Sequence, residues 1–247
     1  MSIKKKIVLL FRAIKRISNW HEYILDYLGF KKRDIIYSID NKKIKLRGGT
    51  IDKTILTEVL LTNKYFPEWL KFSRGDIVVD AGAHIGIFSV LVDADIVYAI
   101  EPSTDNFRML SEQIKLNNKK IIPVNIALFD KNGKIKLFSG NHSARSSLVR
   151  DEGGSKEIVK TKMMKSFFDE NKIKKCKLMK IDVEGSEYKI LYATPKQTLQ
   201  KIENILMEVH KVPGESPQEL KKFLEKNNFN VELCVDFLYA RNKSVVK

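Results

Sequence analysis

Two pairs of polar residues, placed where predicted strands end, could carry out acid–base chemistry. Asp182 and Glu184 are two residues apart, and so are Glu208 and His210. Residues two apart in a strand point to the same side, and ligands of open α/β sheets bind beyond the carboxyl ends of the strands. We therefore expect all four groups at one site. Histidine titrates near neutral pH, which makes His210 the first candidate for a general base and Asp182 its rival, with Glu184 and Glu208 holding a substrate or orienting the base.

Two other interpretations of these residues stay open. Asp182, Glu184, Glu208 and His210 all offer hard ligands that suit Mg²⁺, so Asp182, Glu208 and His210 form a candidate metal site that would acidify a bound diol. Two such pairs do not define a coordination set, however. Alternatively, Asp182 caps the following helix and Glu184 lies on its first turn. Because buried carboxylates are costly unless they are paired or used, we favour a functional role.

A glycine-containing turn, Asp80-Ala81-Gly82-Ala83-His84-Ile85-Gly86, follows another predicted strand. Glycines let the backbone turn sharply and approach a ligand, and the helix after the turn begins with unpaired N–H groups. Only Gly82 and Gly86 are present, which argues against a dinucleotide fingerprint, and the absence of Gly-Lys-Ser/Thr excludes a P-loop. The next predicted strand ends at Glu101-Pro102, where an acid can accept hydrogen bonds from both ribose hydroxyls. Together these features indicate a ribose-bearing ligand other than a dinucleotide or a nucleoside triphosphate.

The elements that must position these groups alternate between strands and helices, which predicts a mostly parallel sheet with right-handed crossovers. The predicted strands cover 77–80, 96–100, 121–127, 134–138, 158–161, 178–183, 204–209, 230–235 and 237–241, and the last two form an antiparallel hairpin. Helices are predicted after Gly86 and over 104–116, 187–192 and 218–226. Residues 139–156, which include His142, are predicted to be a polar loop that helps to shape an acceptor pocket.

The N-terminal segment is predicted to be helical over residues 3–28. Ile3, Ile7, Leu10, Ile14 and Ile17 form one apolar stripe, and most of the lysines and arginines lie off it. We expect the stripe to pack on protein, with a membrane surface as the alternative. A hairpin over 35–46 and a helix over 55–65 follow. The chain thus divides into a basic amphipathic segment, 1–34, and a domain, 35–247, which comprises a hairpin and helix, 35–70, and a core, 75–247.

Residues 75–130 and 176–210 resemble the FkbM family of class I S-adenosylmethionine-dependent methyltransferases. The Asp182-Val183-Glu184-Gly185 segment is the most specific part of the resemblance, and the Arg47-Gly48-Gly49-Thr50-x-Asp52 turn and the Ser146-Ser147-Leu148 loop are also similar. The other matching segments are Val79-Asp80-Ala81-Gly82-Ala83, Ile100-Glu101-Pro102, Asn125-Ile126-Ala127-Leu128, Lys180-Ile181 before and Ser186-Glu187 after the specific segment, and Leu206-Met207-Glu208-Val209-His210.

This resemblance implies a Rossmann-like α/β fold: a mostly parallel sheet of seven strands with a C-terminal antiparallel hairpin and helices on both faces. It implies S-adenosylmethionine as the methyl donor and, commonly, a hydroxyl oxygen of a sugar or natural product as the acceptor. Position 84, where similar sequences more often have Asn, departs from the pattern. The residues that the resemblance places at the donor are Asp80, Gly82, Ala83, His84, Gly86, Glu101, Pro102, Asn125, Ala127 and Asp182, with Asn125 and Ala127 at the adenine.

The composition is that of an ordinary soluble globular protein, with 43% hydrophobic and 30% charged residues. Cys176 and Cys234 are too few and too far apart for a disulfide framework or a cysteine zinc site. No apolar run is long enough to span a membrane, so we expect a cytoplasmic protein with peripheral membrane contact through the N-terminal helix as an option. The net charge of +15 makes an RNA methyltransferase the alternative function. The lysines are scattered without interleaved aromatic residues, so nucleic acid is not the expected partner.

Overall fold

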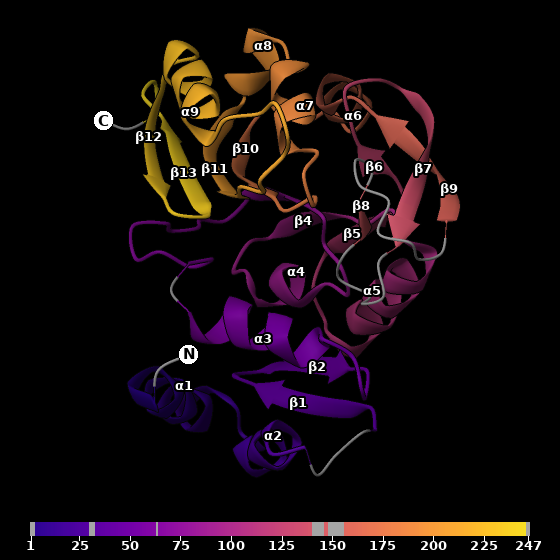
Figure 1. The fold of residues 1–247 in the computed structure, drawn as a ribbon, viewed down its shortest axis with the longest axis vertical. Helices are drawn as coiled ribbons and strands as arrows, with labels where there is room; N and C mark the ends of the chain where they lie inside the picture. The colour runs from indigo at the N-terminus through magenta and orange to yellow at the C-terminus, as the bar shows by residue number, and fades with distance from the viewer. Residues whose placement is uncertain (1–2, 30–32, 63, 140–145, 148–155, 246–247) are drawn as a thin grey trace.

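The protein is described here from a computed structural model, which covers residues 3–29, 33–62, 64–139, 146–147 and 156–245. Figure 1 shows a central twisted sheet with helices on both faces and the N-terminal elements stacked at one end of the molecule. His142, and most of the loop predicted over 139–156, lie outside the described residues.

Seven strands form the central sheet in the order β12-β13-β11-β10-β3-β4-β5. Every neighbouring pair is parallel except those that include β13, which runs antiparallel to β11 and β12. This arrangement confirms the predicted sheet and its C-terminal hairpin. The strands are β3 (Ile77–Ala81), β4 (Ile96–Ile100), β5 (Ile121–Val124), β10 (Cys176–Ile181), β11 (Ile202–Glu208), β12 (Phe229–Cys234) and β13 (Phe237–Asn242).

Helices cover both faces of this sheet because its strands carry apolar residues on alternate sides. Val78 belongs to the core that packs under α3, α4 and α5, whereas Val79 belongs to the core under α6 to α9. The order β4-β3-β10 places the topological switch point between β3 and β10, where open α/β sheets bind ligands. The helices are α3 (Asp52–Leu61), α4 (Ile87–Leu91), α5 (Thr104–Leu116), α6 (Met164–Glu170), α7 (Glu187–Tyr192), α8 (Lys196–Leu199) and α9 (Pro217–Lys226).

The strand predicted over 121–127 is divided between two sheets. β5 ends at Val124, and β6 (Ala127–Leu128) joins a second sheet of order β6-β9-β7-β8 with β9 (Lys156–Lys162), β7 (Gly133–Ser139) and β8 (Ser146–Ser147). The side-chain amide of Asn125 donates to the carbonyls of Glu101 and Pro102, and this contact accompanies the departure of the chain from the central sheet. The expectation that Asn125 and Ala127 end one strand was therefore wrong.

The helix predicted over 3–28 is interrupted. The structure has α1 (Ile3–Arg16) and α2 (Trp20–Tyr27), separated by residues that pair with the hairpin of β1 (Ile35–Ile39) and β2 (Lys42–Leu46). Ile17 forms a β-bridge with Ile39, and Asn19 hydrogen-bonds the backbone of Ile36 and Ser38. These tertiary hydrogen bonds replace the intrahelical ones, which is why the apolar periodicity did not reveal the break.

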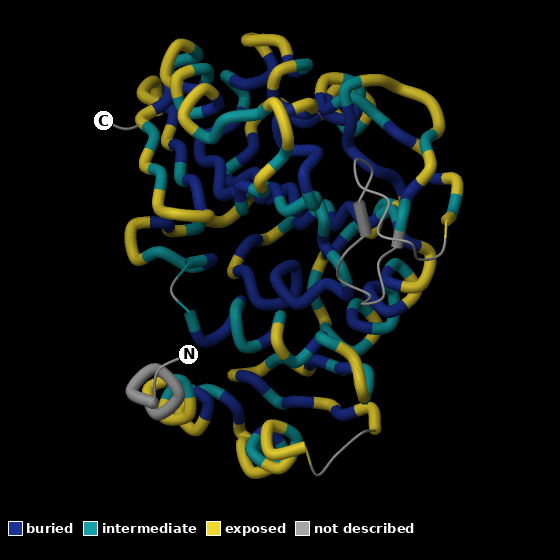
Figure 2. Tube along the Cα trace, in the orientation of Figure 1, coloured by how far each residue is buried: buried dark blue, intermediate teal, exposed yellow. Residues whose placement is uncertain are grey.

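Within α1, the stripe residues whose side chains the structure describes, Leu10 and Ile14, are not buried, contrary to our expectation that the stripe packs on the protein. Ile17 is buried, but the side chains of Leu10 and Ile14 are 39% and 38% exposed. The face that packs on the protein instead includes Ala13, which is fully buried, and the partly buried Leu9. Figure 2 shows exposed positions along the outer sides of both α1 and α2.

Candidate active site

Buried contacts of Asp80 stabilise the turn that follows β3. Asp80 is fully buried, forms an ion pair with Lys180 at 3.0 Å, and accepts a hydrogen bond from Ser89 Oγ at 2.6 Å. Gly82 has φ of +77°, and a β-carbon there would overlap the carbonyl oxygen of Asp182. Only glycine lets the ends of β3 and β10 approach so closely. Asp80 thus supports the turn and does not line the cavity described below.

Glu101 lies at the carboxyl end of β4 and faces the turn. Its two carboxylate oxygens accept hydrogen bonds from the backbone N–H groups of His84 and Ser103, both at 2.9 Å. Burial raises the pKa of Glu101 to about 7, even though these hydrogen bonds favour its charged form. A buried acid with oxygen lone pairs to spare suits the two hydroxyl donors of a ribose.

A buried ion pair from the N-terminal part of the chain contacts the same turn. Arg47 donates to Asp52 through Nε at 2.9 Å and through Nη2 at 2.8 Å, and Asp52 is fully buried. Arg47 Nη2 also lies 3.4 Å from His84 Nε2 and donates to Asn106 at 3.1 Å. Burial lowers the pKa of His84 to about 4, so its ring is neutral at pH 7. His84 also has a left-handed backbone conformation, with φ of +53°, and its side chain lies against the guanidinium of Arg47.

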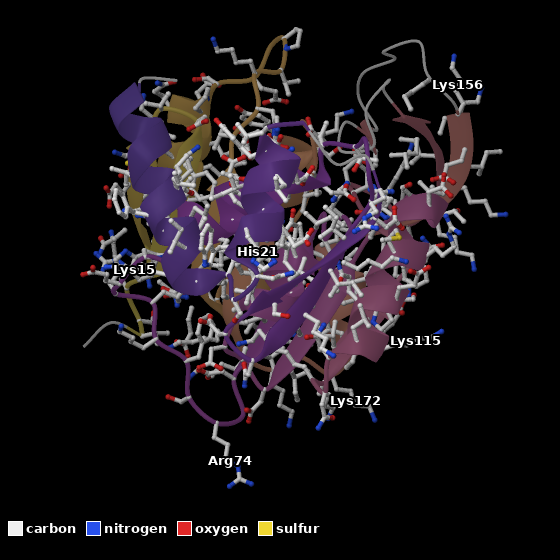
Figure 3. The ribbon with its side chains drawn as sticks, turned by 90° about the horizontal axis from the view of Figure 1, so that it is seen from below. Lys15, His21, Arg74, Lys115, Lys156 and Lys172 are labelled. Carbon is white, nitrogen blue, oxygen red and sulfur yellow. The ribbon has the colours of Figure 1, made fainter. Side chains whose placement is uncertain are left out.

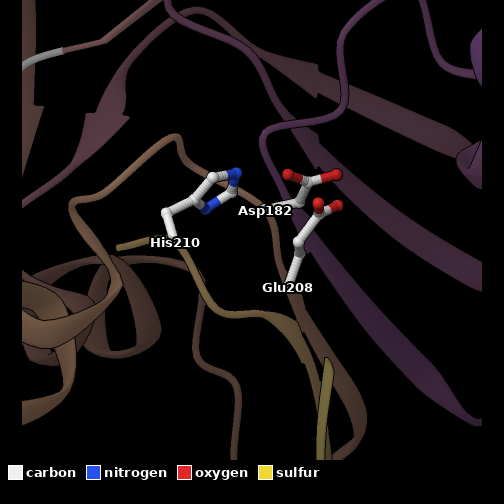
Figure 4. A group of neighbouring side chains, drawn as sticks. All are labelled: Asp182, Glu208 and His210. Carbon is white, nitrogen blue, oxygen red and sulfur yellow. The ribbon is translucent and has the colours of Figure 1, made fainter. Parts of the chain in front are cut away.

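The second constellation gathers beyond β10 and β11, at the same edge of the sheet. Asp182, Glu208 and His210 each offer an atom within 4.8 Å of the others, and their side chains converge in Figure 4. We expected these side chains to converge because residues two apart in a strand point to the same side, but three of the four residues lie outside the strands. Glu208 is the last residue of β11, whereas Asp182, Glu184 and His210 lie past the strand ends. Glu184, with φ of +50°, instead points its carboxylate to within 3.4 Å of His210 Nε2.

A buried acid that the sequence did not single out for chemistry orients His210. Glu187 is fully buried at the start of α7, and one of its oxygens accepts from both the backbone N–H of His210 at 2.7 Å and the ring Nδ1 at 2.9 Å. Its other oxygen accepts from Gly185 N at 2.8 Å. Burial alone would lower the pKa of His210, but the hydrogen bond and charge of Glu187, with the charges of Glu184 and Asp182, raise it to about 9. His210 is therefore protonated at neutral pH.

The surroundings of Glu208 disfavour its charged form, whereas those of His210 favour the charged form of the imidazole. Burial and the neighbouring charge of Asp182 raise the pKa of Glu208 to about 7, so it can accept a proton near neutral pH. The Tyr65 hydroxyl lies 3.4 Å from Asp182 and 3.5 Å from Glu208. Lys180, buried between Asp80 at 3.0 Å and Asp182 at 3.7 Å, joins the two constellations. The sequence analysis did not predict Tyr65 and Lys180 as site residues, because neither lies at the end of a predicted strand.

One continuous cavity of about 550 Å³ contains both constellations, a size within the usual range for ligand sites. Residues of α3, together with Tyr65 and Phe88, form part of its lining. The predicted donor residues that line it are Gly82, Ala83, His84, Glu101, Pro102, Ala127 and Asp182, whereas Asp80, Gly86 and Asn125 lie outside its lining. The remaining lining residues include Ile51, Thr54, Ile55, Glu58, Val59, Lys180, Glu184, Glu208 and His210.

A family model described as the methyltransferase FkbM domain matches residues 80–231, which is more than half of the 247-residue chain. The chain belongs to the FkbM methyltransferase family. It is an S-adenosylmethionine-dependent methyltransferase, as the sequence predicted. The family match includes the glycine turn, Glu101 and both strand ends with their acids, but not Arg47, Asp52 or the N-terminal helices.

Two curated methyltransferases are similar to this FkbM-family chain. The hexuronic acid methyltransferase AglP of Haloferax volcanii is 26% identical over 175 residues, which are 68% of this chain and 72% of AglP. Methyltransferase sdnD of Sordaria araneosa is 24% identical over 191 residues, 62% of this chain and 73% of sdnD. Among solved structures, M. jannaschii TYW2 in complex with AdoMet aligns over 85% of this chain and 84% of that one, with a TM-score of 0.39 and 17% identity.

Proposed function

We propose that this enzyme methylates a hydroxyl oxygen of a sugar, a glycan or another small molecule. The observation that carries the proposal is that the Asp182, Glu208 and His210 group lies in the same cavity as the glycine turn. Carboxylates and an imidazolium can hydrogen-bond a polyhydroxyl acceptor and manage its proton. The similarity to a protein named as a hexuronic acid methyltransferase supports a sugar acceptor.

The residues on the donor side of the cavity fit S-adenosylmethionine. We assign Glu101 to the ribose hydroxyls, the backbone of Gly82, Ala83 and His84 to the methionine end, and Pro102 and Ala127 to the adenine. Asp80, Gly86 and Asn125 act from outside the cavity lining by shaping the turn and the end of β5. The donor supplies an electrophilic methyl group, whose bond to sulfur breaks as its bond to the acceptor oxygen forms.

Proton transfer from the acceptor is assigned to Glu208. The sequence favoured His210 as the base, but an imidazole that is already protonated at pH 7 cannot accept the proton. Glu208, with its pKa raised to about 7, can. His210, fixed by Glu187, supplies a positive charge beside Asp182 and Glu208 and a donor for an acceptor hydroxyl. Asp182 and Glu184 then orient His210 and the acceptor.

Substitution of the base tests this assignment. A general base contributes roughly 10²- to 10⁴-fold to a rate, so we expect Glu208→Gln to lower kcat by at least about 100-fold. Because Glu208 lies on the acceptor side, the Kd for S-adenosylhomocysteine should not change. Glu225→Gln, at an exposed residue of α9 paired with Lys221, is the matched control. The assay measures methyl transfer from labelled donor to a panel of neutral and acidic sugars and to RNA.

Three outcomes would contradict the proposal. Full activity of Glu208→Gln would remove Glu208 from proton transfer. Loss of activity on chelation, with recovery on adding Mg²⁺, would replace the base with a metal at Asp182, Glu208 and His210, whereas we expect chelators to have no effect because protonated His210 already balances the carboxylates. Incorporation of label into RNA but not into sugars would favour the alternative that the net charge of +15 suggests.

A further inference from the structure

The exposed apolar side chains of this protein are concentrated on its N-terminal helices. Fourteen large hydrophobic residues are exposed among those that the structure describes, and eight of them lie between residues 8 and 28. Scattered exposed hydrophobic residues are normal, but a concentration of them on two helices that contact each other indicates an interaction surface. These eight residues, the N-terminal apolar surface, are Val8, Leu10, Phe11, Ile14, Trp20, Leu25, Tyr27 and Leu28.

The orientation of α1 is fixed by the opposite side of the helix. Ala13 is fully buried in the core beside α3. On that side Arg12 donates to the carbonyl of Leu61 at 2.6 Å, and Arg16 donates to the carbonyl of Leu60 at 2.9 Å. The last carbonyls of a helix lack partners within it, so these arginines satisfy the end of α3. Turning the apolar stripe inward would break both hydrogen bonds and expose Ala13.

The helix that carries Phe11, which is 62% exposed, is also strongly basic. The 14 residues of α1 include six lysines and arginines and no acid; Arg12 and Arg16 bind α3, and Lys15 is exposed. A second copy of the chain docked through this face would bring two such sets of like charges together, which disfavours a dimer interface. Anionic lipid headgroups would instead attract these cations while the acyl region receives the apolar side chains.

We propose that the N-terminal apolar surface docks on an anionic lipid bilayer. α1 and α2 lie side by side at the end of the molecule beyond the β1–β2 hairpin, and both face the viewer in Figure 3, with Lys15 and His21 labelled on them. The enzyme would lie on the membrane without crossing it. Among the described residues, no helix is both long and apolar enough to span a bilayer. The proposal does not depend on the identity of the methyl acceptor.

Vesicle flotation with the full chain tests the proposal. We expect the protein to float with phosphatidylcholine vesicles that contain phosphatidylglycerol and not with phosphatidylcholine alone. Burying one large apolar side chain contributes roughly 1.5–3 kcal/mol, or about tenfold or more in partitioning. Phe11→Ser with Ile14→Ser should therefore weaken binding by about tenfold or more, and Lys15→Glu should weaken it on anionic vesicles. Because Phe11 is largely exposed and Ile14 partly exposed, the variants should melt close to the wild-type temperature.

Ile158→Ser is the matched control, because Ile158 is 71% exposed but lies on β9, away from both N-terminal helices. It should float like the wild type. Failure of the wild-type protein to float with anionic vesicles would overturn the proposal, as would an equal loss in the Ile158→Ser control. Light scattering tests whether a second copy of the chain occupies this surface instead. A dimer that Phe11→Ser with Ile14→Ser abolishes would make the N-terminal apolar surface an interface between two copies and overturn the proposal.

Discussion

At the scale of single residues, the proposed mechanism depends on how two carboxylates and an imidazole share protons. Glu187 raises the pKa of His210, whereas burial and then the charge of Asp182 raise the pKa of Glu208. Glu187 therefore stabilises the proton on His210, and Asp182 increases the proton affinity of Glu208. In the proposed mechanism, this difference in environment makes Glu208 the base and His210 the fixed positive charge.

Glu187→Gln should lower the pKa of His210 from about 9 toward its ordinary value of 6.5, because the variant removes the largest stabilising interaction of the imidazolium. A pKa raised on folding contributes stability below pH 6.5 that is lost as the pH rises to 9. We expect the difference in unfolding free energy between wild type and variant to shrink between pH 6 and pH 9.5, by at most roughly 3 kcal/mol, because Glu184 and Asp182 remain. NMR titration of the ring and urea unfolding measure these quantities.

The matched control for this prediction is Glu225→Gln, which removes an exposed acid from an i,i+4 pair on α9. Surface pairs of this kind contribute little, so its pH profile should follow the wild type. An unchanged pKa of His210 in Glu187→Gln would show that Glu184 and Asp182, and not Glu187, hold the proton.

At the scale of elements, the donor side of the cavity is assembled from two separate parts of the chain. The start of α3 and the end of β2 provide Asp52 and Arg47, which reach His84 on the turn after β3 and Asn106 on α5. Residues of α3 also line the part of the cavity that we propose for the acceptor. The N-terminal elements thus contribute to both halves of the active site although they lie outside the family match.

Asp52→Asn should weaken binding of S-adenosylhomocysteine by about tenfold or more, because breaking a buried pair leaves Arg47 uncompensated and releases His84. Calorimetric titration of the variant measures the Kd. Asp26→Asn is the control, since Asp26 pairs with Lys53 at 3.2 Å in the same part of the chain without contacting the turn. The control should lose some stability and keep the wild-type Kd. Equal losses of affinity in both variants would reduce the Arg47–Asp52 pair to a general structural role.

At the scale of the whole molecule, the N-terminal segment shares its core with one face of the central sheet. Ala13, Ile17 and Tyr23 are almost fully buried in the same apolar cluster as Val78 and Leu178. The Tyr23 hydroxyl also hydrogen-bonds Thr57 on α3 at 2.8 Å. We therefore propose that residues 1–34, although a separate segment by sequence pattern, are needed for the stability of the remainder.

A truncation to residues 35–247 should unfold at a lower temperature. Exposing the core that three buried side chains cover costs several kcal/mol, and each kcal/mol lowers the Tm of a protein of this size by roughly 2–4 °C. We expect a decrease of roughly 10 °C in calorimetry. Phe11→Ser with Ile14→Ser changes the more exposed side of the same helix and should lower the Tm much less. A truncated protein as stable as the full chain would show that the segment is an appendage.

The sequence by itself determined the alternating strands and helices, the glycine turn, Glu101 and the placing of Asp182, Glu208 and His210 at one edge of the sheet. These features follow from local rules: side-chain periodicity, the φ angles that glycine permits, and the way parallel strands end together. Only the tertiary structure decided which side of α1 packs, that Asn125 leaves the central sheet, that Glu187 binds His210, and that Arg47 and Asp52 support His84. Periodicity shows that a residue needs a partner, but which distant group supplies the hydrogen bond or the charge depends on the packed chain.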